Sequence, residues 1–169
     1  AALTHGHPSG FVSAGLMAAA IRGLLEDLPL HTSLIQSAGL ARAWAGNEET
    51  LELLQIALEL SVRPFAGVLP EILGQGWVGE QALAIAVYAA SRSQSFQEVM
   101  VIAANHSGDS DSTASLAGQL FGAQHGLESL PQSWIRRLDV LDATLDLADW
   151  SLPLWRRMLR PGQDFKEQQ

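Results

Sequence analysis

A polar cluster at residues 105–113 interrupts an otherwise apolar chain and runs directly into a stretch of small residues, 114–123. The cluster reads Asn-His-Ser-Gly-Asp-Ser-Asp-Ser-Thr. Asp and Ser side chains compete with the backbone for hydrogen bonds inside a helix, whereas the same side chains are favoured at a helix N-terminus. The sequence therefore predicts a loop over 105–112 that leads into a helix, which fixes where one helix must begin.

Two carboxylates of this loop, Asp109 and Asp111, are two residues apart. Within a regular helix such residues point about 200° apart, so they share a ligand only if Asp109 lies at or before the N-cap. Carboxylate and hydroxyl oxygens without nearby Cys suit a hard cation such as Mg²⁺, Mn²⁺ or Ca²⁺. Two alternatives remain open. Asp109 and Ser112 only cap the helix, or the segment is a Ca²⁺ loop, although it lacks the Glu that an EF-hand requires.

The composition indicates one domain with an acidic surface. Of the 169 residues, 47% are hydrophobic, which is enough to bury a core. The formal net charge of −8 disfavours nucleic acids and anionic membranes as partners, because both repel an acidic surface. The absence of cysteine excludes disulfides and fits a cytoplasmic protein. No signal-peptide pattern is present, and the polar residues within the longest apolar run, 11–25, favour a buried helix over a membrane span.

The apolar residues recur with helical spacing along the chain. Pro8 suits a first helical turn, and Pro29 lies beyond the end of the helix that Pro8 opens. We expect helices at about 8–27, 31–45, 48–62, 79–92, 95–104, 111–125 and 132–147. Prolines and glycines break the segment 63–79, and no alternating strand pattern appears. The sequence thus predicts an all-α fold.

Small residues form a stripe along two of the expected helices. The stripes repeat every four residues and consist of Gly15, Ala19 and Gly23 in one helix and of Ala114, Gly118 and Gly122 in the other. Such stripes let another backbone approach closely. If the two stripes pack on each other, the loops that precede them meet at one end of a helical bundle. The alternative is that the stripes only reflect an alanine-rich core.

Three motifs together resemble a known family. Residues 105–123, followed by Leu-Pro-Gln-Ser-Trp at 130–134, resemble the C-terminal signature of the ADP-ribosylglycohydrolases, the dinitrogenase-reductase-activating glycohydrolase family. Thr-His-Gly-His-Pro at 4–8 resembles the family's T-H-x-x-P segment, and residues 73–83 resemble its G-x-G-W-x-x-E-x-A-L segment. The motifs occur in the family's order and cover nearly the whole chain. Ser107 replaces a family glycine, while Ser110 and Ser112 replace threonines and keep the hydroxyl group.

This resemblance implies a compact orthogonal helical domain that hydrolyses an ADP-ribosyl glycosidic bond with Mg²⁺. It implies two Mg²⁺ ions, with Mn²⁺ as a substitute, held in part by Asp109, Asp111 and Ser112. It places three further residues on the ligand, beside bound ADP-ribose: His5, Gly76 and Trp77. The Asp-Ser-Asp-Ser-Thr wording favours ADP-ribosylated arginine on a protein as the substrate. No acid–base residue is assigned.

The sequence leaves two alternative roles open for Trp77 and for His106. Trp77 lies in a glycine-rich loop, where an exposed indole stacks on adenine or a buried one fills the core. Trp134, Trp150 and Trp155 are expected to pack in the core or between helices. His106, next to the acidic loop, either orients a ligand or is solvated.

Two family segments, G-D-x-x-G and T-D-D, do not occur in residues 1–169. We therefore expect residues 1–169 to form the C-terminal portion of a single ADP-ribosylglycohydrolase domain. The missing N-terminal segment is then a partner that supplies the other half of the metal site, and this chain alone is incomplete as an enzyme. Two alternative functions remain, a non-catalytic ADP-ribose or nucleotide binder and a toxin-immunity interaction module of the same fold.

Overall fold

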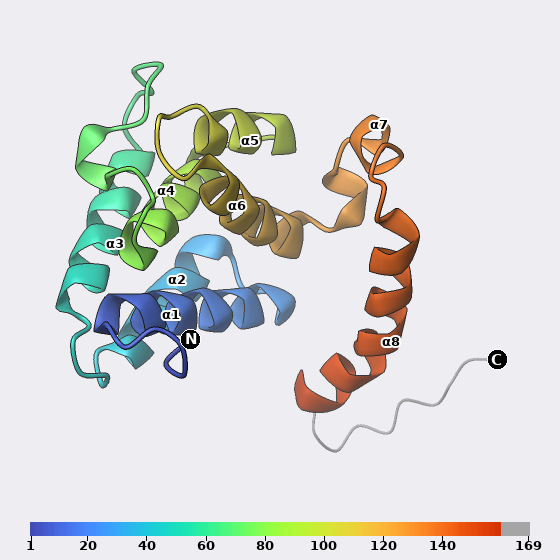
Figure 1. The fold of residues 1–169 in the computed structure, drawn as a ribbon, viewed down its shortest axis with the longest axis horizontal. Coiled ribbons are helices and arrows are strands. Elements are labelled where there is room, and N and C mark those ends of the chain that lie inside the picture. Colours follow the sequence, from blue (N-terminus) through green and yellow to red (C-terminus); the bar gives the residue numbers. More distant parts are fainter. Residues whose placement is uncertain (160–169) are drawn as a thin grey trace. The chain divides into compact units, whose positions relative to one another are not determined.

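The computed structural model describes residues 1–159, which are largely helical and contain no strand (Figure 1). Helices α1 to α8 span Pro8–Leu25, Leu30–Ala41, Glu48–Ser61, Gly79–Arg92, Phe96–Ala104, Ser110–His125, Gln132–Ile135 and Leu141–Leu159. Two short 3-10 helices, η1 and η2, span Glu71–Leu73 and Leu127–Ser129. The chain divides into two compact units, Ala1–Leu130 and Pro131–Gln169. The predicted all-α fold is confirmed.

Helix α1 begins where the sequence predicts, because Pro8 occupies its first turn and His7 caps it. The Nδ1 atom of His7 accepts a hydrogen bond from the Ser9 N–H at 3.3 Å. Among the described residues, α1 is the one helix long and apolar enough to cross a membrane. Its buried side, which includes Leu16 and Ala20, belongs to the core and packs against α2, α3, α4 and α6. Helix α1 is therefore a core helix of the first unit.

Helix α4 is the centre of the first unit. Residues 82–90 are all buried, and five of these nine are alanines. Small side chains let neighbouring helices approach from several sides, and α4 packs against α1, α3, α5 and α6. In Figure 1, α3 lies along one side of α4 and the α5–α6 pair along another. The N-terminal end of α4 is thus held at a fixed place relative to α1 and α6.

The two small-residue stripes have different neighbours. Gly23 of α1 lies against the hydroxyl group of Ser33 in α2. Gly118 of α6 faces Met100 and Phe96 of α5. The glycines therefore bring α1 against α2 and α6 against α5. Gly23 and Gly118 thus face the neighbouring helices in the chain and not the other stripe, although α1 and α6 also pack on each other.

The second unit contains a break that the sequence analysis did not predict. Helix α7 ends at Ile135 and α8 begins at Leu141, whereas we expected one helix over 132–147. Apolar residues keep helical spacing across the break, so periodicity alone misses it. Asp142 lies in the first turn of α8, where a carboxylate is favoured by the helix dipole. The start of α8 is therefore marked by a helix-start residue, Asp142, within an apolar pattern that continues across the break.

Two tryptophans of the second unit, Trp134 and Trp150, are not buried. Trp134 is 46% exposed and Trp150 is 69% exposed, so neither is a buried core residue. The side chain of Trp155 lies outside the described residues. A tryptophan adds to apolar periodicity whether or not a neighbour covers its ring, and periodicity therefore overestimates its burial.

Replacing Ile85 by Ala should lower the free energy of unfolding by about 2–5 kcal/mol, because it leaves a cavity in the α4 core. Ile85 is fully buried, whereas Leu40 on α2 is 61% exposed. The matched control Leu40→Ala should change the same free energy by less than about 0.5 kcal/mol. Chemical denaturation followed by circular dichroism measures both. Equal effects would contradict the central position of α4.

Candidate functional site

The first turn of α4 packs directly on the first turns of α1. Gly79 is the first residue of α4, and a Cβ atom there would overlap the Ser13 hydroxyl and lie 3.1 Å from the Ser9 carbonyl oxygen. A residue without a Cβ is therefore needed for this approach. The contact brings the motif at 4–8 and the motif at 73–83 to the same end of the first unit.

The glycine-rich loop before α4 lies on the polar loop before α6. Gly76 has a φ of 81°, and a Cβ there would lie 2.7 Å from Thr113 Cγ2. A Cβ at Gly108 would overlap the carbonyl oxygen of Gln75, and the N–H of Asp109 donates to that same oxygen at 2.8 Å. The two loops are joined backbone to backbone. All three motifs therefore meet at one end of the first unit.

The two acidic residues of the polar loop both lie at the start of α6. Asp109 is the N-cap residue of α6, and within the described part of the chain its side chain makes no capping hydrogen bond. A hydrogen bond with the Asp109 carboxyl group holds the pKa of Asp111 below its ordinary value, and a second hydrogen bond from the Ser112 N–H acts in the same direction. The latter joins N and Oδ1 at 2.8 Å. The alternative that Asp109 serves only as a side-chain cap is wrong.

This pair has the donor chemistry of a hard-cation site. Adjacent carboxylates repel each other unless a proton or a cation lies with them. Asp111 and Ser112 are exposed and Asp109 is half-buried, so their oxygens are accessible. The described residues contain no group of three or more His, Cys, Asp or Glu side chains arranged for a metal ion. The donors present thus fit part of a Mg²⁺ or Mn²⁺ coordination shell.

His106 holds the polar loop against α6. Its Nδ1 accepts a hydrogen bond from the Gly108 N–H at 3.1 Å, and its Nε2 lies 3.0 Å from the Ala103 carbonyl oxygen. Because Nδ1 is an acceptor, the network assigns the ring proton to Nε2, which donates to that carbonyl. The buried Thr113 hydroxyl donates to the same carbonyl oxygen at 2.7 Å. His106 therefore braces the loop, a role that neither of its two expected roles describes.

The indole of Trp77 lies outside the core. It is 67% exposed, and its Nε1–H donates to the side-chain Oε1 of Gln75 at 3.2 Å. Of the two alternatives for Trp77, the structure supports the exposed ring and excludes the core plug. Gly76, the preceding residue, is buried.

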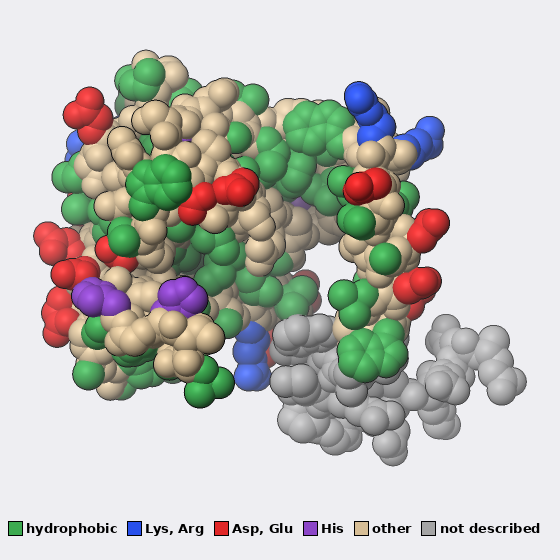
Figure 2. Space-filling view, in the orientation of Figure 1, with side chains coloured by type: hydrophobic (Ala, Val, Ile, Leu, Met, Phe, Trp, Pro, Cys, Tyr) green, Lys and Arg blue, Asp and Glu red, His purple; other side chains and the backbone are tan. Residues whose placement is uncertain are grey.

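His5 lies beside the first turn of α1. Its Nδ1 is 2.8 Å from the Thr4 hydroxyl oxygen, and a Cβ at Gly10 would lie 3.3 Å from His5 Cβ. A Cβ at Gly79 would in turn lie 3.3 Å from Gly10 Cα. His5 is therefore linked to the other predicted residues through the first turns of α1 and α4. Figure 2 shows histidine side chains exposed over this N-terminal segment.

The sequence profile of the ADP-ribosylglycohydrolases matches residues 1–163. The chain belongs to the ADP-ribosylglycohydrolase family. This confirms the family that the three motifs indicate, and the all-α fold agrees with it. No solved structure matches the chain.

Three curated relatives share segments with this family member. ADP-ribosylarginine hydrolase Tri1 of Pseudomonas putida (strain GB-1) is 35% identical over 68 residues, 40% of this chain and 18% of that protein. Tri1 of Serratia proteamaculans (strain 568) is 32% identical over 95 residues, which are 56% of this chain and 24% of that protein. ADP-ribosyl-[dinitrogen reductase] glycohydrolase of Rhodospirillum rubrum is 38% identical over 45 residues, which are 27% of this chain and 15% of that protein. The matched segments span less than a quarter of each relative.

Some residues that shape the family's glycine loop were missed by the sequence analysis. The Oε1 atom of Gln81 accepts hydrogen bonds from the N–H groups of Gln75 and Gly76, each at 3.2 Å. The neighbouring Glu80 has a buried Oε2 without a hydrogen-bond partner among the described residues. A glutamine in the first turn of a helix is an ordinary surface residue by sequence. Only the fold reveals that it reaches back to the loop.

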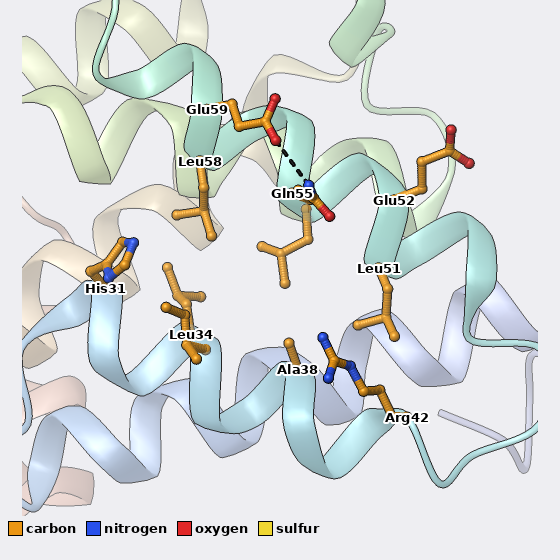
Figure 3. Close-up of a pocket in the computed structure, with 11 residues that line it drawn as sticks. His31, Leu34, Ala38, Arg42, Leu51, Glu52, Gln55, Leu58 and Glu59 are labelled. Atoms are coloured by element: carbon orange, nitrogen blue, oxygen red, sulfur yellow. Dashed lines mark hydrogen bonds between the residues drawn. The ribbon is translucent and has the colours of Figure 1, made fainter.

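A groove between α2 and α3 lies apart from these residues (Figure 3). Its volume is about 370 Å³, and side chains such as Leu34, Ala38 and Leu58 point into it from the two helices. Arg42 and Glu59 line its edges. None of the predicted site residues lines the groove, so the family motifs and the groove are separate features of the first unit.

Replacing Gly108 by Ala should separate the two loops, because the new Cβ overlaps the Gln75 carbonyl oxygen. We expect the free energy of unfolding to fall by about 1–3 kcal/mol and the Asp109 amide to exchange faster. The control Gly122→Ala, also on the α6 side, places its Cβ more than 4 Å from any other described atom outside the local helix backbone. It should stabilise the chain by up to about 1 kcal/mol. Denaturation and hydrogen exchange measure both, and an unchanged Gly108→Ala protein would contradict the loop contact.

Proposed function

We propose that the protein containing this chain uses Mg²⁺ to hydrolyse the ADP-ribosyl bond of ADP-ribosylated arginine on proteins. The placement of Asp109 and Asp111 at the start of α6, beside the glycine loop of an ADP-ribosylglycohydrolase, carries this proposal. Two relatives are named ADP-ribosylarginine hydrolase, and the third is named ADP-ribosyl-[dinitrogen reductase] glycohydrolase. These names support an ADP-ribosyl bond as the substrate and favour arginine as the linked residue.

Asp109, Asp111 and Ser112 form the metal side of the proposed site. Mg²⁺ requires near-octahedral oxygen coordination, and Mn²⁺ accepts similar ligands. Two carboxylates and one hydroxyl make up part of the shells of two ions, and water supplies further oxygens. When bound, these ions make a water molecule nucleophilic for attack on the anomeric carbon. The chain itself keeps the oxygens in place, through the Asp109 backbone bond and the Ser112 N–H.

Gly76, Trp77 and His5 form the ligand side. The indole of Trp77 is held at its edge by Gln75, so its exposed face is available to stack on adenine. Gly76 lets the loop backbone lie close to α6, where a Cβ at position 76 would be 3.6 Å from the Cβ of Asp109. The exposed imidazole of His5 donates a hydrogen bond to a phosphate or a ribose hydroxyl.

The composition supports a protein-bound substrate in the cytoplasm. The formal net charge of −8 disfavours nucleic acids and anionic membranes as partners. The absence of cysteine fits a reducing compartment. We therefore propose a cytoplasmic enzyme whose partner is the ADP-ribose moiety of a modified protein.

Replacing Asp109 or Asp111 by Ala should abolish Mg²⁺-dependent release of ADP-ribose in the natural protein that contains this chain. Loss of residues that only support a metal ligand typically costs about 10- to 100-fold, so loss of a direct ligand should cost at least about 100-fold. Stability should change by no more than about 1 kcal/mol, the worth of a helix cap. Chromatographic detection of ADP-ribose released from ADP-ribosylated arginine measures the rate.

The matched control is Asp139→Ala, which removes an exposed carboxylate from the second unit and should leave the rate unchanged. Normal turnover in both Asp109→Ala and Asp111→Ala would disprove the metal assignment. If the wild-type protein binds ADP-ribose but hydrolyses no ADP-ribosyl bond at any Mg²⁺ concentration, the non-catalytic binder replaces the enzyme as the function.

Replacing Trp77 or His5 by Ala should weaken ADP-ribose binding more than Mg²⁺ binding. Stacking of a base on an aromatic ring contributes about 1–3 kcal/mol, so Trp77→Ala should weaken ADP-ribose binding by about 5- to 150-fold. Isothermal titration calorimetry with each ligand separates the two effects. Trp150→Ala, which removes another exposed indole, is the control. An unchanged affinity for ADP-ribose in both variants would exclude these residues from the ligand site.

A further inference from the structure

Gln81 links the first turn of α4 to the glycine loop that precedes it. It is the third residue of α4 and is half-buried. Its Oε1 accepts hydrogen bonds from the N–H groups of Gln75 and Gly76, each at 3.2 Å. Its carboxamide fills the space beside Gly74, where a Cβ would overlap it. One side chain therefore holds the backbone of three consecutive loop residues.

Gln75, which Gln81 holds, contacts both sides of the proposed site. Its carbonyl oxygen accepts the Asp109 N–H at 2.8 Å, on the metal side. Its side-chain Oε1 accepts the Trp77 Nε1–H at 3.2 Å, on the ligand side. A shift of the Gln75 backbone would therefore move the indole and the start of α6 together.

The loop needs such a restraint because its own conformation is costly. Gly74 and Gly76 both have positive φ values, 78° and 81°, and glycines lose more conformational freedom on folding than other residues. Gly76 is buried, so its backbone N–H requires a hydrogen-bond acceptor. Gln81 supplies that acceptor from the first turn of α4, a helix whose residues 82–90 are all buried.

We propose that Gln81 is a positioning residue that couples the two sides of the site: by fixing Gln75, it sets both Trp77 and Asp109. This inference rests on the proposed function, because it takes Trp77 to face ADP-ribose and Asp109 to face Mg²⁺. Two ligands that each favour one arrangement of the same loop strengthen each other's binding by the same factor. Mg²⁺ therefore raises the affinity for ADP-ribose through Gln75, and ADP-ribose raises the affinity for Mg²⁺ equally.

The test compares three variants of the natural protein that contains this chain with its wild type. Gln81→Leu removes the acceptor, whereas Gln81→Glu keeps an oxygen at the same reach. Gln75→Ala removes the indole acceptor but keeps the carbonyl that holds Asp109. The control is Gln119→Leu, an exposed glutamine of α6 whose side chain bonds only to the Ser115 hydroxyl among described groups.

Hydrogen exchange, followed by NMR, gives a readout that does not depend on activity. In Gln81→Leu, the amides of Gly76 and Asp109 and the indole N–H of Trp77 should exchange about 5- to 10-fold faster, the change expected from the loss of about one hydrogen bond. The Ile85 amide should not change. Gln81→Glu should keep wild-type exchange. Gln75→Ala should speed exchange at the Trp77 indole alone.

Calorimetry then measures the coupling as the ratio of ADP-ribose affinities with and without Mg²⁺. We expect a ratio well above one in the wild type and in Gln119→Leu, and a ratio near one in Gln81→Leu. Unchanged exchange at Asp109 and Trp77 in Gln81→Leu would overturn the proposal, as would equal acceleration at Ile85, which indicates general destabilisation. A wild-type protein that binds neither ligand would refute the coupling and the proposed site, while the exchange data would still decide whether Gln81 positions the loop.

Discussion

The hydrogen bond from the Asp109 N–H to the Gln75 carbonyl oxygen joins the two halves of the candidate site. It connects backbone atoms, so it does not depend on side-chain rotamers. Gly108 makes it possible, because any Cβ there would occupy the position of the carbonyl oxygen. Without this contact, the glycine loop and the start of α6 would be two independent surface features. With it, the exposed indole of Trp77 and the carboxylates of Asp109 and Asp111 lie on loops that are hydrogen-bonded to each other.

The N-terminal end of α6 also favours the negative charges of the candidate site. The N-terminal end of a helix carries a partial positive charge, which stabilises carboxylates placed in its first turn. Asp109 and Asp111 lie at that end of α6, and the lowered pKa of Asp111 favours its ionised form. The fold therefore offsets part of the repulsion between two carboxylates before any cation binds.

Local signals were sufficient to predict much of this structure, and contacts between distant segments were not. The helix start at Pro8 and the loop before α6, with Asp109 as the N-cap residue, follow from capping and turn chemistry within a few residues. The break before α8 was missed because apolar spacing continues through it. The role of Gln81 was missed because its partners precede its helix and its residue type is ordinary there. Sequence patterns report periodicity and caps, but not which side chain reaches back to a loop.

Because main-chain atoms make the contact between the glycine loop and the polar loop, neighbouring positions of the polar loop differ in the substitutions they tolerate during evolution. Ser107 is exposed, and its φ is outside the left-handed region, so many residue types suit that position. Gly108, next to it, lies against a carbonyl oxygen that no side chain tolerates. Selection therefore acts very differently on two adjacent positions. Drift at 107 is nearly neutral, while a substitution at 108 persists only with a compensating change in the facing loop.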